Sequence, residues 1–176
     1  MSRPPRGPGE IRTVVRAATR ADTPAILSIN RAGMPGVGEL GQADVERFLG
    51  MSPFFRVAER AGLLAAYLIG VGSEADYDGE EFLWFRERFS AFLYVDQIAV
   101  AAEARGAGVA SRLYAELESF AGGRGVPLLA LEVNLRPMNR PSLLFHERQR
   151  FSEVGRLETA DGRLVSLQTR SIAKDP

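Results

Sequence analysis

The chain has 176 residues, of which 45% are hydrophobic and 25% are charged, a composition typical of one globular domain. Its 22 basic and 22 acidic residues balance, which argues against a dedicated binder of nucleic acid or anionic membranes, since such proteins carry a basic excess. With no Cys and a single His, His146, the sequence excludes disulfides, thiolate metal sites, a Cys nucleophile and zinc motifs built on His pairs.

The sequence predicts neither a signal peptide at its N-terminus nor a membrane-spanning segment. Residues 1–9 hold three prolines and no hydrophobic run, unlike a signal peptide. The longest apolar stretch, residues 61–71, is too short to cross a bilayer. We therefore expect a cytoplasmic protein with a flexible tail over residues 1–10 and a single domain over residues 11–176.

In the first part of the chain, apolar runs mark strands and capping residues mark helices. Asp22 and Pro24 favour a helix start, because Asp caps free N–H groups and Pro is tolerated in the first turn. Gly50 favours a helix end, and the continuous apolar run at residues 63–71 predicts a buried central strand. The elements expected up to residue 100 are strand 11–17, helix 22–33, a Gly-rich loop at 35–41, helix 44–49, strands 55–59 and 63–71, an insertion or short helix at 74–90, and strand 92–100.

The second part predicts two helices alternating with strands. Val109, Leu113 and Leu117 recur at helical spacing, and the pair at residues 161–162, Asp-Gly, favours a hairpin turn. The expected elements are helix 106–122, strand 127–133, helix 139–148, and strands 151–159 and 163–171. Because antiparallel hairpins alternate with crossover helices, we expect an α/β protein with a mixed sheet.

The loop between strand 92–100 and the following helix carries the clearest chemical signal. Residues 105–110 read Arg-Gly-Ala-Gly-Val-Ala, so a Gly-rich turn leads directly into a helix N-terminus. Free backbone N–H groups and the helix dipole make such a turn an anion site, most naturally for a phosphate. Gly106 and Gly108 lack a Cβ and allow close approach of the backbone. The same glycines also fit a plain helix entry that binds nothing.

Two other phosphate motifs fit this loop less well. A P-loop requires Gly-Lys-Ser/Thr, and the loop holds no Lys. In a dinucleotide fingerprint the strand runs almost directly into the first Gly, whereas residues 101–105 intervene here and Ser111 stands where the third Gly is expected. Glu132 could imitate the ribose-binding acid of that motif, so a nucleotide-binding oxidoreductase stays open as an alternative.

Residues 105–110 resemble the Q/R-x-x-G-x-G/A signature of the GNAT N-acetyltransferase superfamily. Residues 96–100 are similar to the fourth strand of that family, residues 139–151 to its later N-x-x-S/A-x-x-F-Y…G-F block, and residues 11–24 to its usual opening. The resemblance implies a mixed, mostly antiparallel sheet of seven strands, splayed between strands four and five and flanked by about four helices. His146 replaces the Tyr of the later block, and Arg150 replaces its Gly, which leaves the local turn in question.

The resemblance implies transfer of an acetyl group from acetyl-CoA to a primary amine by direct attack in a ternary complex, without a metal. Backbone amides of residues 106–111 would hold the pyrophosphate, and Arg105 would add positive charge. The edge of the strand at residues 98–100 would pair with pantetheine, and the N–H of Val100 would polarise the thioester carbonyl. The residues implied for acetyl-CoA are Ile98, Ala99, Val100, Arg105, Gly106, Ala107, Gly108, Val109, Ala110, Ser111, Asn139, Ser142 and Phe145.

Three residues are candidates for proton transfer. A reacting amine must lose a proton, and Asp96 is the candidate base, on the same strand face as Tyr94. His146 could protonate the departing thiolate as an imidazolium, with Tyr94 as an alternative donor. Two of them also fit roles without catalysis: Asp96 could be a surface acid, and His146 could be a packing residue. Since the Tyr of the family block is missing, a non-catalytic acyl-CoA-binding or regulatory domain is the second hypothesis.

The resemblance places the acceptor site at residues 30–50 and 74–92. The stretch at residues 77–85 combines carboxylates with aromatic rings, which would suit a cationic amine. Trp84 and Phe85 equally fit a core or dimer contact. We expect the acceptor to be a small-molecule or peptide amine. We expect no nucleic-acid or membrane partner, and the sequence is compatible with a homodimer.

Overall fold

The computed structural model describes residues 11–172, so the tail expected at residues 1–10 lies outside the described residues. The strands are β1 (Thr13–Ala17), β2 (Phe54–Arg60), β3 (Leu63–Gly72), β4 (Leu93–Val100), β5 (Leu128–Arg136), β6 (Ser152–Glu158) and β7 (Leu164–Ser171). The helices are α1 (Thr23–Gly33), α2 (Gln42–Met51), α3 (Glu80–Arg86), α4 (Val109–Gly123) and α5 (Arg140–Arg148), with short 3-10 turns at Arg20–Asp22 and Ala102–Ala104. Within this part of the chain, no helix is both long enough and apolar enough to cross a membrane.

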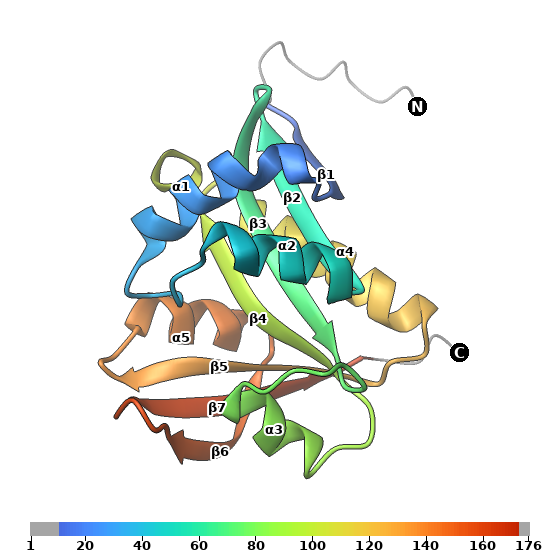
Figure 1. Cartoon of the computed structure of the whole chain (residues 1–176), viewed down its shortest axis with the longest axis vertical. Coiled ribbons are helices and arrows are strands. Elements are labelled where there is room, and N and C mark those ends of the chain that lie inside the picture. Colours follow the sequence, from blue (N-terminus) through green and yellow to red (C-terminus); the bar gives the residue numbers. More distant parts are fainter. Residues whose placement is uncertain (1–10, 173–176) are drawn as a thin grey trace, which may run out of the picture.

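The seven strands form one sheet in the order β1-β2-β3-β4-β5-β7-β6 (Figure 1). Every neighbouring pair is antiparallel except β4 and β5, which run parallel. That parallel pairing covers only Leu93 with Leu129 and Tyr94 with Ala130, after which the two strands diverge. The mixed sheet and its splay between the fourth and fifth strands are therefore confirmed. In Figure 1, α1 and α2 cover one face of β1–β4, and α4 lies behind it.

The helix α3 lies within the region expected to be an insertion or a short helix, and it contributes to the core. Phe82 and Phe85 are fully buried and pack edge-on or tilted against Phe92 and Tyr94, with ring centroids 5.5 to 6.0 Å apart. Such aromatic pairs stabilise beyond the area they bury. Trp84 is only partly buried and lies beneath the guanidinium of Arg88. The aromatic residues of this segment thus fix α3 to the edge of the opening between β4 and β5.

One expected helix cap and one expected helix end were wrong, although α1 begins directly after Asp22 with Pro24 in its first turn, as predicted. The carboxylate of Asp22 does not cap α1; it accepts a hydrogen bond from the N–H of Thr19 at 2.8 Å and pairs with Arg16 at 2.7 Å. The hydrogen bond from Arg16 lowers the pKa of Asp22 to about 2. Gly50 does not end α2, which continues to Met51. At Asp22 a tertiary contact, the pairing with Arg16, overrides the local signal.

The turn after α5 keeps its shape despite the substitution at position 150. Arg150 has φ +65°, the left-handed region that favours Gly. The N–H of Phe151 donates to the carbonyl of His146 at 3.0 Å, and the N–H of Arg150 donates to the carbonyl of Glu147 at 2.9 Å. This bonding pattern is the usual helix ending with a left-handed residue just past its last turn. Arg150 therefore adopts the conformation that Gly would adopt more readily.

Candidate active site

Two cavities meet where β4 and β5 diverge. The first, of about 660 Å3, lies between the end of β4, the loop at residues 104–111 and the start of α5; we call it the glycine-loop cavity. The second, of about 400 Å3, lies between β4, β5, the loop at residues 35–38 and the turn at 161–163; we call it the carboxyl cavity. Six residues line both: Gly36, Val37, Ile98, Asn139, Ser142 and His146. The two cavities therefore adjoin at the opened sheet, with these residues between them.

The glycine-loop cavity offers backbone amides to an anion. Gly106 and Gly108 have φ +74° and +75°, and a Cβ built on either would meet no atom within 4 Å. The first bond of α4 joins the N–H of Arg112 to the carbonyl of Gly108 at 3.0 Å. The preceding N–H groups, at residues 109–111, therefore lie at the free helix end, where an anion is favoured. The space and donors at this end fit a phosphate group.

The structure brings together nearly all the residues that the resemblance implied for the coenzyme. Twelve of them line the glycine-loop cavity: Ile98, Ala99, Val100, Arg105, Gly106, Gly108, Val109, Ala110, Ser111, Asn139, Ser142 and Phe145. Ala107 does not line it, and the carbonyl of Ala107 instead accepts a hydrogen bond from Arg60 at 3.3 Å. From residue 95 onward β4 pairs with β3 alone, so its other edge is free to pair with an extended ligand.

The loop at residues 35–38 forms one wall of both cavities and is held from below by buried side chains. Asn30 is fully buried; its amide donates to the carbonyl of Gly38 at 2.8 Å, and its oxygen accepts from the N–H of Leu40 at 2.9 Å. Gln97 on β4 also donates to the carbonyl of Gly38, at 2.9 Å, and accepts from the hydroxyl of Tyr67 at 2.8 Å. Because these buried groups satisfy one another, they fix the position of the loop.

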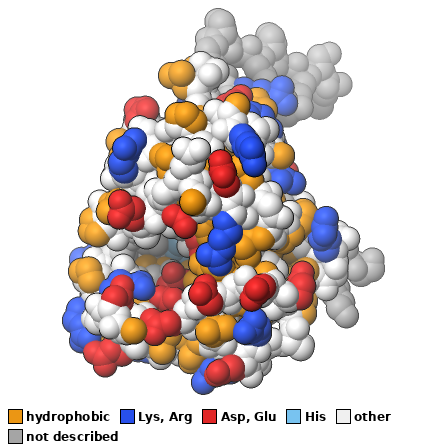
Figure 2. Space-filling view, in the orientation of Figure 1, with side chains coloured by type: hydrophobic (Ala, Val, Ile, Leu, Met, Phe, Trp, Pro, Cys, Tyr) orange, Lys and Arg blue, Asp and Glu red, His pale blue; other side chains and the backbone are white. Residues whose placement is uncertain are grey.

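Two carboxyl groups face the carboxyl cavity from opposite sides of the splay. Asp96 and Glu132 each lie two residues beyond the last β4–β5 pair, Tyr94 with Ala130, so they stand level across the opening. The hydroxyl of Tyr77 donates to Asp96, and that of Tyr94 donates to Glu132 at 2.5 Å. Figure 2 shows the opening as a hollow with acidic side chains along its lower rim.

Burial changes the protonation of both carboxyl groups. Removal from water raises the pKa of Asp96 to about 6, and the neighbouring carboxylate of Glu81 adds to this. The same two causes raise the pKa of Glu132 to about 8. The hydroxyls of Tyr77 and Tyr94 act in the opposite direction, because they donate hydrogen bonds to the carboxylates. Near neutral pH, Asp96 is mostly ionised and Glu132 mostly holds a proton.

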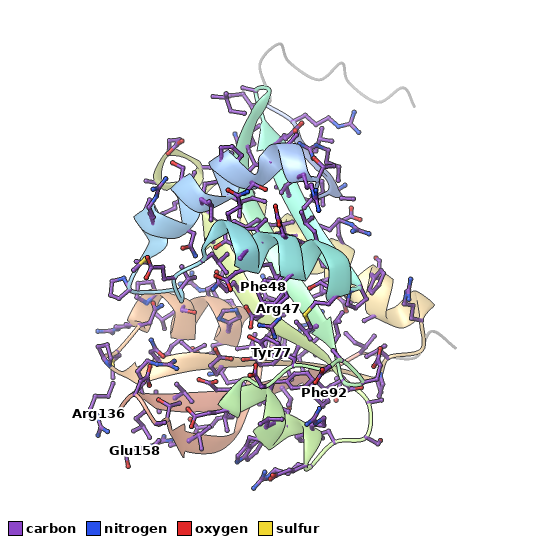
Figure 3. All side chains as sticks on the ribbon, viewed as in Figure 1. Arg47, Phe48, Tyr77, Phe92, Arg136 and Glu158 are labelled. Carbon is purple, nitrogen blue, oxygen red and sulfur yellow. The ribbon has the colours of Figure 1, made fainter. Side chains whose placement is uncertain are left out.

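One guanidinium lines the carboxyl cavity, and it is already paired. Arg163 bonds to Glu81 at 3.1 Å, to Asp161 at 2.8 Å and to the side-chain oxygen of Asn134 at 3.3 Å. Arg47 lies farther out, over the ring of Tyr77 (Figure 3), with its guanidinium 5.2 Å from the ring centroid. Among residues 11–172, no cluster of three or more His, Cys, Asp or Glu side chains is arranged to hold a metal ion.

His146 is a neutral ring at the junction of the two cavities. Its Nδ1 lies 2.9 Å from the carbonyl of Ser142, which only accepts, so Nδ1 carries the hydrogen. Its Nε2 therefore accepts from the hydroxyl of Tyr114, 2.7 Å away on α4. Burial lowers the pKa of His146 to about 4. The imidazolium expected from the sequence is thus not the form that this environment favours near neutral pH.

All three residues expected to transfer protons, Asp96, His146 and Tyr94, line the carboxyl cavity. The hydroxyl of Tyr94 is engaged with Glu132. Sequence reasoning missed the roles of Glu132 and Tyr114 in this site. The signal for Glu132 was a lone acid within the apolar run Leu128–Val133, whereas nothing local distinguishes Tyr114 from other helix residues. From the regions expected to bind the acceptor, residues 35–38, Tyr77 and Glu81 line this cavity, and Trp84 and Phe85 do not.

Comparison with known proteins relates this arrangement to one family. Residues 39–151, more than half of the chain, match the acetyltransferase (GNAT) family. Ard1 from Thermoplasma volcanium superimposes with a TM-score of 0.75 at 17% identity, over 92% of this chain and 98% of its own. A ribosomal-protein-alanine N-acetyltransferase from Brucella melitensis gives 0.67 at 25% identity, over 90% and 99%. The yncA protein from Salmonella typhimurium, crystallised with its cofactor acetyl-CoA, gives 0.68 at 15% identity, over 94% and 96%. No curated protein matches the chain significantly.

Proposed function

The chain belongs to the GNAT family of acetyltransferases, and from this premise we propose that it transfers an acetyl group from acetyl-CoA to a primary amine. One observation supports the proposal: a glycine loop with free helix N–H groups and an acid-lined cavity adjoin at the splay between β4 and β5. A long coenzyme entering from one end would meet an amine entering from the other. The attack would then be direct, within a ternary complex.

The coenzyme is proposed to occupy the glycine-loop cavity. Its diphosphate would accept hydrogen bonds from the amides of residues 106–111, with Arg105 adding charge at the rim. Pantetheine would lie along the free edge of β4 at residues 98–100, with the N–H of Val100 near the thioester carbonyl. Asn139, Ser142 and Phe145 would close the opposite side. The related Salmonella protein, which holds acetyl-CoA, supports this choice of coenzyme.

Asp96 is proposed to accept the proton of the incoming ammonium. With its pKa raised to about 6, Asp96 is ionised at neutral pH and is still a stronger base than an ordinary aspartate. Glu132, at about 8, still holds its proton there and is less suited to the task. Water in the cavity would complete the path where the carboxylate does not reach the amine directly.

Proton transfer to the departing thiolate is proposed to come from Tyr114, with His146 as its positioning residue. The amine nitrogen forms a bond to the acetyl carbon while the carbon–sulfur bond breaks, and the Tyr114 hydroxyl turns from Nε2 of His146 toward the sulfur and gives it its proton. The second proton lost by the nitrogen then restores that hydroxyl. His146 orients the hydroxyl through Nε2. The phenol would thus come from Tyr114 on α4, and not from position 146, where the family block has its Tyr.

A non-catalytic acyl-CoA-binding domain is the second candidate, because His146 is buried and neutral where an acid is expected. The two candidates separate in one experiment: incubation with acetyl-CoA and a panel of primary amines, followed by a thiol-reactive dye. Amine-dependent release of free CoA supports the transferase. Acetyl-CoA binding without thiol release on any amine would favour the sensor. Binding of NAD with no binding of CoA would contradict both.

A further inference from the structure

We propose that the acceptor is a small molecule with two cationic groups, such as a diamine, whose second ammonium binds Glu132 while the reacting amine faces Asp96. This inference rests on the proposed function, because it assigns the carboxyl cavity to the acceptor. It goes further by naming the chemistry of that acceptor and by giving Glu132 a binding role.

The first argument is the charge of the cavity. Four carboxyl side chains line it, namely Glu81, Asp96, Glu132 and Asp161, against one guanidinium. Arg163 pairs with Glu81 and Asp161, which leaves the other two acids. None of the ion pairs among residues 11–172 includes Asp96 or Glu132. Both side chains are partly shielded and reach the cavity. A carboxylate that is partly removed from water is stabilised by a nearby cation, so a ligand with two cations would compensate both acids.

The nearby charges on α2 do not supply the missing partners. Arg47 pairs with Asp78 at 3.7 Å and lies over the ring of Tyr77. Its effect on Asp96 is opposed by the carboxylates of Asp44 and Glu81, and the pKa of Asp96 stays raised. The side chains that shift the pKa of Glu132 are Tyr94 and the carboxyls of Glu81 and Asp96, and none of them is a cation. Both acids thus lack a compensating cation in this part of the chain.

The second argument is geometric. Asp96 and Glu132 lie on different strands, level with each other, and each accepts a hydroxyl hydrogen bond of its own, from Tyr77 and Tyr94 respectively. They do not share a proton or a common donor. This arrangement provides two separate positions for cations on the two sides of the opening. A monoamine or a peptide N-terminus would satisfy one of them and leave the other carboxyl unpaired.

The third argument is the size and stiffness of the cavity. A volume of about 400 Å3 suits a small molecule. Its wall at residues 35–38 is held by the buried side chains of Asn30 and Gln97, so the cavity does not widen freely. A peptide without Lys or Arg presents amide groups beyond its N-terminus and no second cation, which makes such a peptide the competing acceptor in the test.

Binding of a dication also has a signature that is independent of turnover. Glu132 mostly holds its proton at pH 7 because its pKa is near 8. An ammonium bound beside it favours the carboxylate and expels that proton. Calorimetric titration of 1,4-diaminobutane into the CoA-bound protein, in two buffers of different ionisation enthalpy, should show release of about one proton per ligand. The unmodified protein suffices for this measurement.

The kinetic test compares 1,4-diaminobutane, 1-aminobutane and an alanine tripeptide as acceptors. We expect kcat/KM to favour the diamine about 10- to 100-fold, the range of one charge-assisted hydrogen bond. Glu132→Gln should remove this preference. Glu116→Gln, the same change on α4 at a half-exposed side chain that lines neither cavity, is the matched control and should retain it.

Contrary outcomes are distinct from failure of the proposed function. Equal use of the monoamine, preference for the tripeptide, or a diamine preference that survives Glu132→Gln would overturn the inference while leaving the transferase intact. Diamine binding without proton release would also overturn the role of Glu132. Absence of acetyl-CoA binding, or of thiol release with every amine, would instead refute the proposed function.

Discussion

The glycine-loop cavity and the carboxyl cavity, which adjoin at the splay of the sheet, are built differently. The glycine-loop cavity is formed largely by backbone and small side chains from one continuous stretch, residues 98–111, with the start of α5 opposite. The carboxyl cavity is formed by residues of β4, β5, α3, α4 and α5 and of the loops at residues 35–38, 77, 139 and 161–163. A ligand shared by many proteins can be held by backbone amides, which are available to any sequence. A particular acceptor requires side chains, and these come from distant positions.

The two cavities also differ in electrostatics. Amides at the start of α4 carry partial positive charge at no desolvation cost beyond that of the helix itself. Asp96 and Glu132, by contrast, are taken out of water without a cation beside them, so both pKa values rise. We therefore expect the glycine-loop cavity to tolerate most substitutions other than those of its glycines. We expect the acids of the carboxyl cavity to lower the stability of the fold in return for function.

The largest expected effect concerns Gly108. Gly108→Trp would place a large side chain in the phosphate space and force a left-handed residue, so acetyl-CoA affinity should fall at least about 100-fold by calorimetry. Gly62→Trp is the matched control, since Gly62 also has a positive φ, +77°, and open space beyond it, but lies in the β2–β3 turn. Gly62→Trp should lower stability similarly and leave affinity unchanged. Unchanged affinity in a folded Gly108→Trp protein would contradict the loop assignment.

The next effect concerns the acceptor end. Asp96→Asn should lower kcat about 100-fold, the usual contribution of a positioned base, with little change in the Kd for acetyl-CoA. In the wild type, kcat/KM should fall as pH drops through about 6, because the carboxylate of Asp96 gains a proton there. The variant should lose this acid limb. A wild-type profile that is flat between pH 5 and 7 would exclude Asp96 as the base.

A smaller effect is expected at the junction of the two cavities. Tyr114→Phe removes only the hydroxyl that bonds to His146 and should lower kcat about 10-fold while acetyl-CoA affinity stays within twofold. His146→Ala should act in the same direction, slowing transfer more than it weakens binding. Parallel losses of kcat and affinity would make these residues binding groups instead.

Removal of a buried acid should stabilise the fold. The pKa of Glu132 is about 8 when folded, above its ordinary value of 4.5, so the folded state binds more protons than the unfolded state between these limits. The free energy of unfolding therefore falls as pH rises from 4.5 to 8. Glu132→Gln should raise the free energy of unfolding by an amount on the order of 2 kcal/mol at pH 8.5 and by less at pH 5, and Tm should rise accordingly. An equal or lower Tm at pH 8.5 would contradict the buried, unpaired state.

The smallest effect lies outside both cavities. Arg150→Gly removes the backbone strain of a non-Gly residue in the left-handed conformation after α5. The free energy of unfolding should therefore rise by about 1 kcal/mol in a denaturant titration. Transfer rate and acetyl-CoA affinity should not change. A loss of affinity would show that the side chain of Arg150 belongs to the coenzyme end.

The difference between the two ends also explains how far the sequence could be interpreted. Strands, helices and the glycine loop follow from local patterns, so the coenzyme end could be assembled from a continuous stretch. Tyr94 with Glu132, 38 residues apart, and Tyr114 with His146, 32 residues apart, meet only through the fold. The protonation state of His146 depends on burial, which a sequence motif does not encode. The partner of Asp22 was missed for the same reason, since Arg16 reaches it from β1.

The central claim is that acetyl-CoA occupies the glycine-loop cavity, from the glycine loop to His146, where the two cavities adjoin. A crystal structure of the complex with CoA tests this most directly. The account predicts the diphosphate within hydrogen-bond distance of the amides at residues 106–111, pantetheine along β4, and the sulfur near the hydroxyl of Tyr114. A complex with the glycine loop empty and CoA bound elsewhere would contradict it.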